Sequence, residues 1–177
     1  MKMILKLFSF VVLFFTIVIL FLPKEQLFYK LINTASQNKV YLSDYTFKEN
    51  LVSSNIKNIN TIYDGINIAN IKNIDAKVLL VYNNINITGI NLDESLNSFV
   101  PSKIKSINIR YSVINPLNVF VDVYSKLYSI KIDFDLIDMK INAVFKTSKF
   151  FRKKYKKLLR ELKYDKDIKD YTYEYKL

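Results

Sequence analysis

The hydrophobic positions of this 177-residue chain follow different patterns from one end to the other. Residues 4–22 form an almost unbroken apolar run, interrupted by one lysine, one serine and one threonine. Residues 24–37 carry apolar side chains at helical spacing, and residues 38–147 contain repeated stretches in which apolar and polar residues alternate. Alternation is typical of half-buried strands, whereas a spacing of three and four is typical of helices. The pattern therefore predicts two helices followed by a β domain.

The apolar run predicts a membrane anchor that begins at Ile4, passes through Leu13 and ends at Leu22. A helix of this length is about 28 Å long, close to the hydrocarbon thickness of a bilayer. The alternative is a cleaved signal peptide, which has a shorter apolar region and small residues at the cleavage site. The flanking residues 21–24, Phe-Leu-Pro-Lys, contain no such site, so we predict a retained anchor.

The lysines beside the apolar run predict its orientation. Lys2 and Lys6 lie on the N-terminal side without an acidic neighbour, whereas Lys24 is followed by Glu25. The positive-inside rule then places the N-terminus in the cytoplasm. The predicted location is a bacterial inner membrane, crossed once, with the C-terminal domain in the periplasm.

The middle of the chain predicts strands in spite of its narrow composition. Residues 55–75 are rich in Asn, Ile and Lys, which leaves disorder and short strands as alternatives. Ile with Asn is a poor helix composition, and Asp64-Gly65 is a strong turn signal. In residues 130–136 apolar and charged residues alternate strictly, which is typical of an antiparallel strand with one buried face. We predict about eight strands in a curved antiparallel meander.

The residues that the chain lacks argue against catalysis. It contains no cysteine, no histidine and only two glycines. Imidazole-dependent catalytic sites, thiolate metal sites and glycine-rich phosphate loops are therefore excluded. Asp133, Asp135 and Asp138 lie close together in the sequence, but Ca²⁺ needs six or more oxygen ligands, so a solvated face is the better interpretation. We predict a protein that is not an enzyme and has no cofactor and no metal.

Residues 148–163 predict an amphipathic basic helix with a net charge of +7, out of +11 for the whole chain. Its apolar side chains recur at helical spacing and form a candidate packing stripe: Phe151, Tyr155, Leu158, Leu159 and Leu162. The cations occupy the other faces and form a candidate surface for a polyanion or a membrane: Arg152, Lys153, Lys154, Lys156, Lys157, Arg160 and Lys163.

Three interpretations of this helix stay open. In the first, its packing stripe lies across the open face of the sheet and the cations are solvated. Alternatively, the helix lies on anionic lipid head groups, or it binds DNA. Residues 164–177 follow as a tyrosine-rich tail, which is either an edge strand or a frayed terminus.

The order of these segments resembles a small family of bitopic membrane proteins of campylobacters. The segments that carry the resemblance are residues 22–29 (LPKEQLFY), 65–74 (GINIANIKNI), 98–101 (SFVP), 115–117 (NPL) and residues 148–176. That family is associated with the transformation system, a DNA-uptake machine related to type II secretion. The chain is more distantly similar to the β domain of type II secretion protein N. The resemblance implies an inner-membrane assembly component and no catalytic residue.

The predicted organisation has five parts. Residues 1–23 are the cytoplasmic tip and anchor, 24–37 a juxtamembrane helix, 38–147 the antiparallel β domain, 148–163 the basic helix and 164–177 the tail. The fold class is a single transmembrane helix plus a β-rich α+β domain. The predicted function is an assembly component of a secretion or DNA-uptake machine that docks protein partners through its sheet. The alternatives are a lipid-binding β-groove module and a DNA-contacting accessory protein.

Overall fold

The structure is a computed structural model that describes residues 6, 9–11, 13–14, 16–18, 21–79, 81–97 and 99–177. The helices are α2 (Lys24–Gln37), the 3-10 helix η1 (Glu94–Leu96), α3 (Lys149–Lys154) and α4 (Lys156–Arg160). The strands are β1 (Val40–Ser43), β2 (Thr46–Glu49), β3 (Ser53–Tyr63), β4 (Ile66–Val78), β5 (Tyr82–Leu92), β6 (Lys103–Ser112), β7 (Asn115–Tyr124), β8 (Tyr128–Asp135), β9 (Lys140–Thr147), β10 (Lys163–Asp165) and β11 (Asp170–Lys176).

The described strands form one 11-stranded sheet in which every pair is antiparallel. Strands β3 to β9 follow one another as a meander, β1 and β2 both pair with β3, and β11 lies between β9 and β10. The Asn- and Ile-rich tract forms β3 and β4, which are joined at Asp64 and Gly65. Both of these residues have positive φ, 49° and 83°, which a type I′ hairpin turn requires.

The strand register gives the sheet one apolar face. Directly opposed residues on neighbouring strands point to the same side of a sheet. A first apolar row runs across eight strands through Ile56, Ile74, Ile87, Ile107, Val123, Ile130, Phe145 and Tyr171. A second apolar row, two residues further along each strand, runs through Ser54, Ala76, Ile85, Ile109, Val121, Ile132, Ala143 and Tyr173.

The opposite face of the sheet is polar. One row on that face contains Asn55, Asp75, Asn86, Asn108, Asp122 and Lys131. Amide side chains bond across strands there; for example, Asn55 Nδ2 donates to Asn73 Oδ1 at 2.7 Å. The asparagines of the low-complexity tract therefore form the solvent side of the sheet, and its isoleucines form the apolar side.

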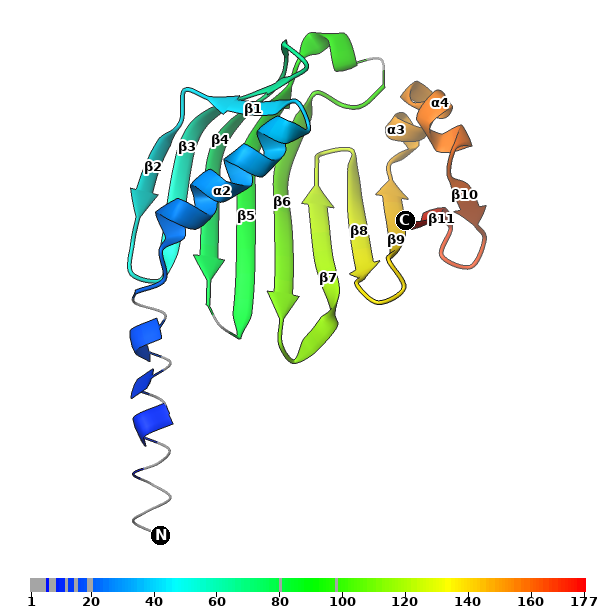
Figure 1. Ribbon diagram of the computed structural model, residues 1–177. Coiled ribbons are helices and arrows are strands. Elements are labelled where there is room, and N and C mark those ends of the chain that lie inside the picture. Colours follow the sequence, from blue (N-terminus) through cyan, green and yellow to red (C-terminus); the bar gives the residue numbers. More distant parts are fainter. Residues whose placement is uncertain are drawn as a thin grey trace.

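Two helical segments cover the apolar face at different places. Figure 1 shows α2 lying diagonally across β3–β5, and α3 and α4 near the end of β9. Phe28 of α2 stacks on Phe47 of β2 with ring centroids 5.0 Å apart. At the other end, a C-terminal cluster of buried residues joins α3 and α4 to the first apolar row: Val123, Tyr128, Phe151, Tyr155 and Leu159. Neither cover extends over the whole face.

The membrane-anchor prediction needs correction. No helix in the described part of the chain is both long enough and apolar enough to cross a membrane. Of the anchor residues, Ile4 lies outside the described residues, Leu13 is helical and Leu22 is not. Apolar composition permits a spanning helix, but spanning also requires about 20 consecutive residues. The predicted single-pass inner-membrane location is wrong on this finding.

The predicted fold class is corrected in the same way. The described chain is a mostly β, antiparallel structure without a spanning helix. The helix predicted over residues 148–163 is two short helices, α3 and α4. They are separated by Tyr155, whose φ of −108° and ψ of 42° are not helical. The apolar spacing fits a continuous and a broken helix equally well, so it did not distinguish them.

Candidate functional site

An apolar groove lies between α2 and the apolar face of the sheet. Its volume is about 380 Å³. Apart from Lys24 and Ser54, the described residues that line it are all apolar: Leu27, Phe28, Leu31, Ile32, Ala35, Leu42, Phe47, Ile56, Ile74, Ala76, Val78, Ile85, Ile87 and Ile109. We call this space the α2 groove.

The groove exists because small residues lie under α2. Ser54 and Ala76 are opposed on β3 and β4, in a row that has isoleucine at its next two positions. Side chains as short as these cannot reach the helix, and Ala35 contributes another small side chain from α2 itself. The apolar stripe of α2 therefore faces the sheet without filling the space between them.

Lys24 closes the groove beside β2. Its side chain is only 2% exposed, and its Nζ lies 3.2 Å from Oε1 of Glu49. The same ammonium donates to the carbonyl oxygen of Leu22 at 3.4 Å. A buried cation needs such partners, because removing it from water is costly. The charge of Lys24 is thus neutralised locally, and the remaining walls of the groove are uncharged.

A second cavity, of about 660 Å³, lies where β5, β6 and the β7–β8 turn meet α3. Five lysines of the described chain stand around it, Lys72, Lys103, Lys105, Lys126 and Lys154, and no acidic residue of that part of the chain lines it. None of the five takes part in an ion pair among the described residues. Apolar side chains form its floor, including Ile90, Ile104, Leu127 and Tyr155. We call it the lysine pocket; five uncompensated cations favour an anion there.

The groove and the pocket are neighbours on β5. Ile87 lines the α2 groove and Ile90 lines the lysine pocket. Three residues along a strand correspond to about 10 Å. Both cavities also belong to the apolar face, because Ile104 of the pocket packs against the C-terminal cluster, which includes Tyr155 and Val123 of the first apolar row. The two cavities therefore lie beside nearby positions of the same strand.

The predicted packing stripe of residues 151–162 lies against the sheet. Phe151, Tyr155 and Leu159 are buried, and Leu158 and Leu162 are partly buried against the same C-terminal cluster. The ring of Phe151 lies 5.1 Å from that of Tyr128 and 4.8 Å from that of Tyr155. Burial raises the pKa of the Tyr128 hydroxyl, and Tyr155 beside it raises this pKa further.

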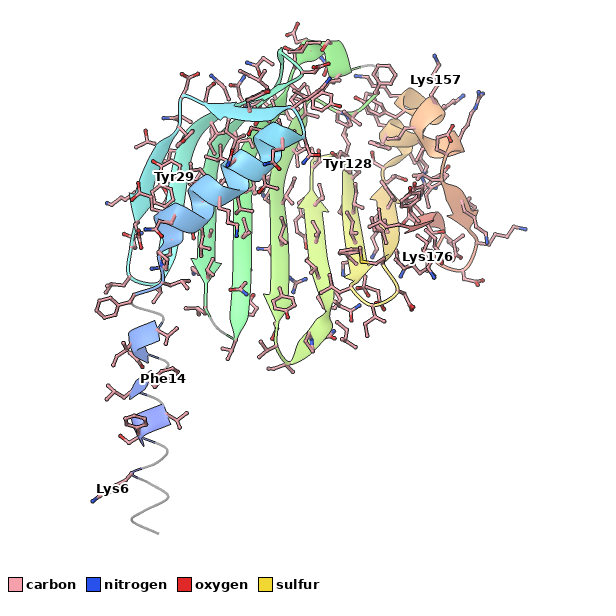
Figure 2. All side chains as sticks on the ribbon, viewed as in Figure 1. Lys6, Phe14, Tyr29, Tyr128, Lys157 and Lys176 are labelled. Carbon is pink, nitrogen blue, oxygen red and sulfur yellow. The ribbon has the colours of Figure 1, made fainter. Side chains whose placement is uncertain are left out.

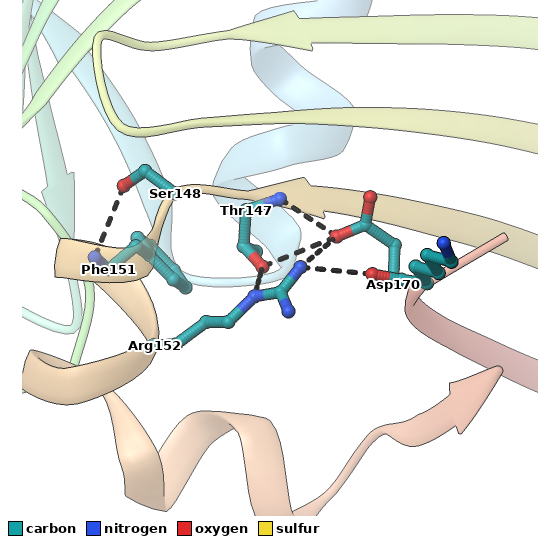
Figure 3. Close-up of polar contacts among 6 residues, drawn as sticks. Thr147, Ser148, Phe151, Arg152 and Asp170 are labelled. Atoms are coloured by element: carbon teal, nitrogen blue, oxygen red, sulfur yellow. Dashed lines mark hydrogen bonds and ion pairs between the residues drawn. The ribbon is translucent and has the colours of Figure 1, made fainter. Parts of the chain in front are cut away.

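The predicted basic surface is divided among different environments. Arg152 is tied into the fold: its guanidinium donates to Oγ1 of Thr147 at 2.9 Å, to Oδ1 of Asp170 at 2.8 Å and to the carbonyl oxygen of Lys169 at 3.0 Å (Figure 3). It joins α3 to β9 and β11 and is not free for a ligand.

The other cations of that segment are exposed, but they do not form one surface. Lys154 lines the lysine pocket, with its Nζ 5.4 Å from the centroid of the Tyr155 ring. Lys163 belongs to β10. Figure 2 shows Lys157 at the periphery of the molecule beside α4. The remaining three, Lys153, Lys156 and Arg160, are likewise exposed.

Sequence reasoning missed four of the five lysines of the pocket. Lys72 comes from β4, Lys103 and Lys105 come from β6, and Lys126 comes from the turn between β7 and β8. Each looks like an ordinary surface lysine in a Lys-rich chain. Only the pairing of β4, β5 and β6 and the packing of α3 bring them together, so no local signal identified them.

The aspartates on and after β8 serve local structure. Asp133 accepts a hydrogen bond from Asn118 Nδ2 at 2.6 Å. Asp135 accepts from the backbone N–H groups of Ile137 and Asp138. Hydrogen bonds from Asp138 and then Ile137 lower the pKa of Asp135. Among the described residues no group of acidic side chains is arranged to hold a metal ion.

Comparison of the chain with protein-family models, with curated proteins and with solved structures finds no match in any of the three. The resemblance to the transformation-associated family is not tested by these comparisons and stays a prediction.

Proposed function

We propose that this protein binds an amphiphile with an anionic head group and does not convert it chemically. The acyl chain occupies the α2 groove, and the head group occupies the lysine pocket. The observation that carries this proposal is the lining of the groove, in which only Lys24 and Ser54 are not apolar. Its volume of about 380 Å³ falls in the range of ligand sites, about 300–1,000 Å³.

The character of the groove favours a hydrocarbon occupant over water. Protein interiors contain few voids larger than a water molecule. Water in a cavity needs polar partners, and the one charged group here, Lys24, already bonds to Glu49 and Leu22. A hydrocarbon chain needs no partner and gains free energy from each methylene group that it buries.

The lysine pocket supports an anionic head group in particular. A phosphate or carboxylate there meets five lysines and no acidic side chain. Cations at a lipid surface contribute about 1 kcal/mol each. The pocket is also close enough to the groove for one molecule to use both cavities.

We expect affinity to rise with the length of the acyl chain. Each buried methylene group contributes about 0.8 kcal/mol, which is about a fourfold decrease in Kd. Saturated fatty acids of increasing length, below their micelle concentrations, should displace a fluorescent fatty acid. Their Kd should decrease about fourfold for each added methylene group until the groove is full. Absence of saturable binding, or an affinity independent of chain length, would contradict the proposal.

We expect the lysine pocket to distinguish charged from uncharged amphiphiles. The triple variant Lys103→Gln, Lys105→Gln, Lys126→Gln should bind a fatty acid about a hundredfold more weakly at low salt, because about 1 kcal/mol is lost for each of the three cations. It should bind the fatty alcohol of equal length unchanged. A matched control replaces Lys57, Lys131 and Lys146, exposed lysines of the strands outside the pocket, with glutamine. If the two triple variants lose equal affinity, the charge effect is non-specific and the head-group assignment is wrong.

The docking role in a secretion or DNA-uptake machine stays a prediction. Neither cavity carries a feature specific to a protein partner or to DNA. The lipid-binding alternative predicted from the sequence required that the basic helix leave part of the sheet face open. In the structure α3 and α4 pack at the C-terminal cluster, and the α2 groove lies outside their contact.

A further inference from the structure

Strand β11 has an outer edge that is only partly paired. On its inner side Tyr171–Lys176 pair with β9. On its outer side only Asp170–Thr172 pair, with the short strand β10. Among the described residues, Tyr173–Lys176 therefore have no strand partner on the outer side. An open edge of this kind is a template for pairing with another chain.

The backbone of this edge has a defined hydrogen-bonding pattern. The Leu177 N–H donates to the carbonyl oxygen of Met139 at 2.9 Å, on the β9 side. Alternate residues of a strand direct their N–H and C=O groups to opposite sides. Glu174 and Lys176 therefore direct their N–H and C=O groups to the open edge. Thr172 directs its own groups to the same side, where it pairs with β10. Two donors and two acceptors are available for an incoming strand.

The side chains of the edge are also arranged by alternation. Tyr173 and Tyr175 are opposed to Ala143 and Ile141 of β9, which places them on the apolar face. Their rings stack with centroids 6.4 Å apart, and they are 39% and 49% exposed. Glu174 and Lys176 lie on the polar face, where Glu174 forms an exposed ion pair with Lys140 at 3.4 Å.

Space for another strand is present beside this edge. Because β10 has only three residues, a notch of about 650 Å³ remains next to the middle of β11. Its lining combines residues of β10, β11 and the segment before β10: Glu161, Lys163, Tyr164, Asp165, Lys166, Thr172, Tyr173 and Glu174.

We propose that β11 pairs antiparallel with β11 of a second copy of this chain, about a two-fold axis at Tyr175. Glu174 of each copy then lies opposite Lys176 of the other, and Tyr175 lies opposite Tyr175. Each copy supplies two N–H groups and two carbonyl oxygens, so four backbone hydrogen bonds form. Opposite charges directly across an antiparallel pair are stabilising.

The register follows from the chemistry of the edge. Backbone bonds form only if Glu174 and Lys176 face residues that also direct their bonds outward. Placing Glu174 opposite Glu174 of the second copy opposes like charges. It also places Lys176 opposite Thr172 of the second copy, which already pairs with β10. Placing Lys176 opposite Lys176 also opposes like charges. Only the register centred on Tyr175 pairs opposite charges twice, and this complementarity selects a second copy as the occupant.

A charge exchange tests the proposal. Glu174→Lys and Lys176→Glu, made singly, should each raise the dimer Kd at least tenfold in sedimentation equilibrium, because each creates two like-charge pairs. The double variant Glu174→Lys, Lys176→Glu should return the Kd to near that of the natural chain. The ion pair with Lys140 is exposed, so its loss has little effect on folding. A monomer at all concentrations, or a double variant no better than the single ones, would overturn the pairing.

A cysteine crosslink tests the axis separately, since the natural chain contains no cysteine. Tyr175 faces its own copy in a non-hydrogen-bonded pair, where Cα atoms are about 4.5 Å apart, within the range for a disulfide. Tyr175→Cys should therefore give a covalent dimer under mild oxidation. Tyr173→Cys should not, because the two copies of residue 173 are offset by four residues, about 13 Å along the strand. Equal crosslinking of both variants would refute this register.

Discussion

Phe151→Ala should lower the free energy of unfolding by about 3–5 kcal/mol, because it removes the centre of the C-terminal cluster. The Phe151 side chain is 1% exposed and contacts the rings of Tyr128 and Tyr155. Its loss leaves a cavity between α3 and the first apolar row that the rigid sheet cannot close. Domains are stable by about 5–15 kcal/mol, so the variant retains only part of its stability. Urea unfolding followed by far-ultraviolet circular dichroism measures the change.

The adjacent residue provides a matched control. Phe150 is 60% exposed, although it has the same side chain and lies in the same turn of α3. Phe150→Ala should change the free energy of unfolding by no more than about 0.5 kcal/mol. Phe151→Leu, which keeps most of the apolar volume, should lose less stability than Phe151→Ala. Equal losses at positions 150 and 151 would mean that α3 does not pack on the sheet as described.

Ala35→Trp should weaken the binding of a long-chain fatty acid at least about tenfold. Ala35 is half-buried and faces the α2 groove, so the indole ring takes space that the acyl chain would occupy. A tenfold loss corresponds to about two methylene groups at about 0.8 kcal/mol each. Displacement of a fluorescent fatty acid measures the loss, and the dependence on chain length should also end at a shorter chain.

Thr34→Trp is the matched control for this experiment. Thr34 precedes Ala35 in α2, is exposed and does not line the groove. The same indole at this position should leave the affinity unchanged within about twofold, a difference of about 0.4 kcal/mol. Circular dichroism should show both variants folded. If both variants bind like the natural chain, or both lose binding equally, the acyl chain does not lie beneath α2.

Elements with a strong local pattern were predictable from the sequence. The strands around Asp64-Gly65 follow from β-branched isoleucines that flank a turn sequence requiring positive φ. The helix over residues 24–37 follows from apolar side chains at helical spacing, and α2 spans these residues. The side chains of the stripe from Phe151 to Leu162 lie in or against the C-terminal cluster.

Features that depend on distant residues were not predictable. The break at Tyr155 comes from the way α3 and α4 fit onto the sheet, which apolar spacing does not describe. The lysine pocket needs β4, β5 and β6 in register and α3 beside them. The apolar run of residues 4–22 shows another limit, because hydropathy measures the transfer of side chains into lipid and does not by itself establish a spanning helix. On the described residues, the anchor predicted from it is contradicted.

The sequence by itself determined which residues alternate, where the chain turns and which side of each strand is apolar, because these depend on neighbours within a few positions. Only the tertiary structure decided that α2 lies over Ser54 and Ala76 and leaves a groove, that five separate lysines gather at one pocket, and that β11 keeps an open edge. Those features depend on the relative positions of elements distant in the chain, and packing sets such positions through contacts that no single segment encodes.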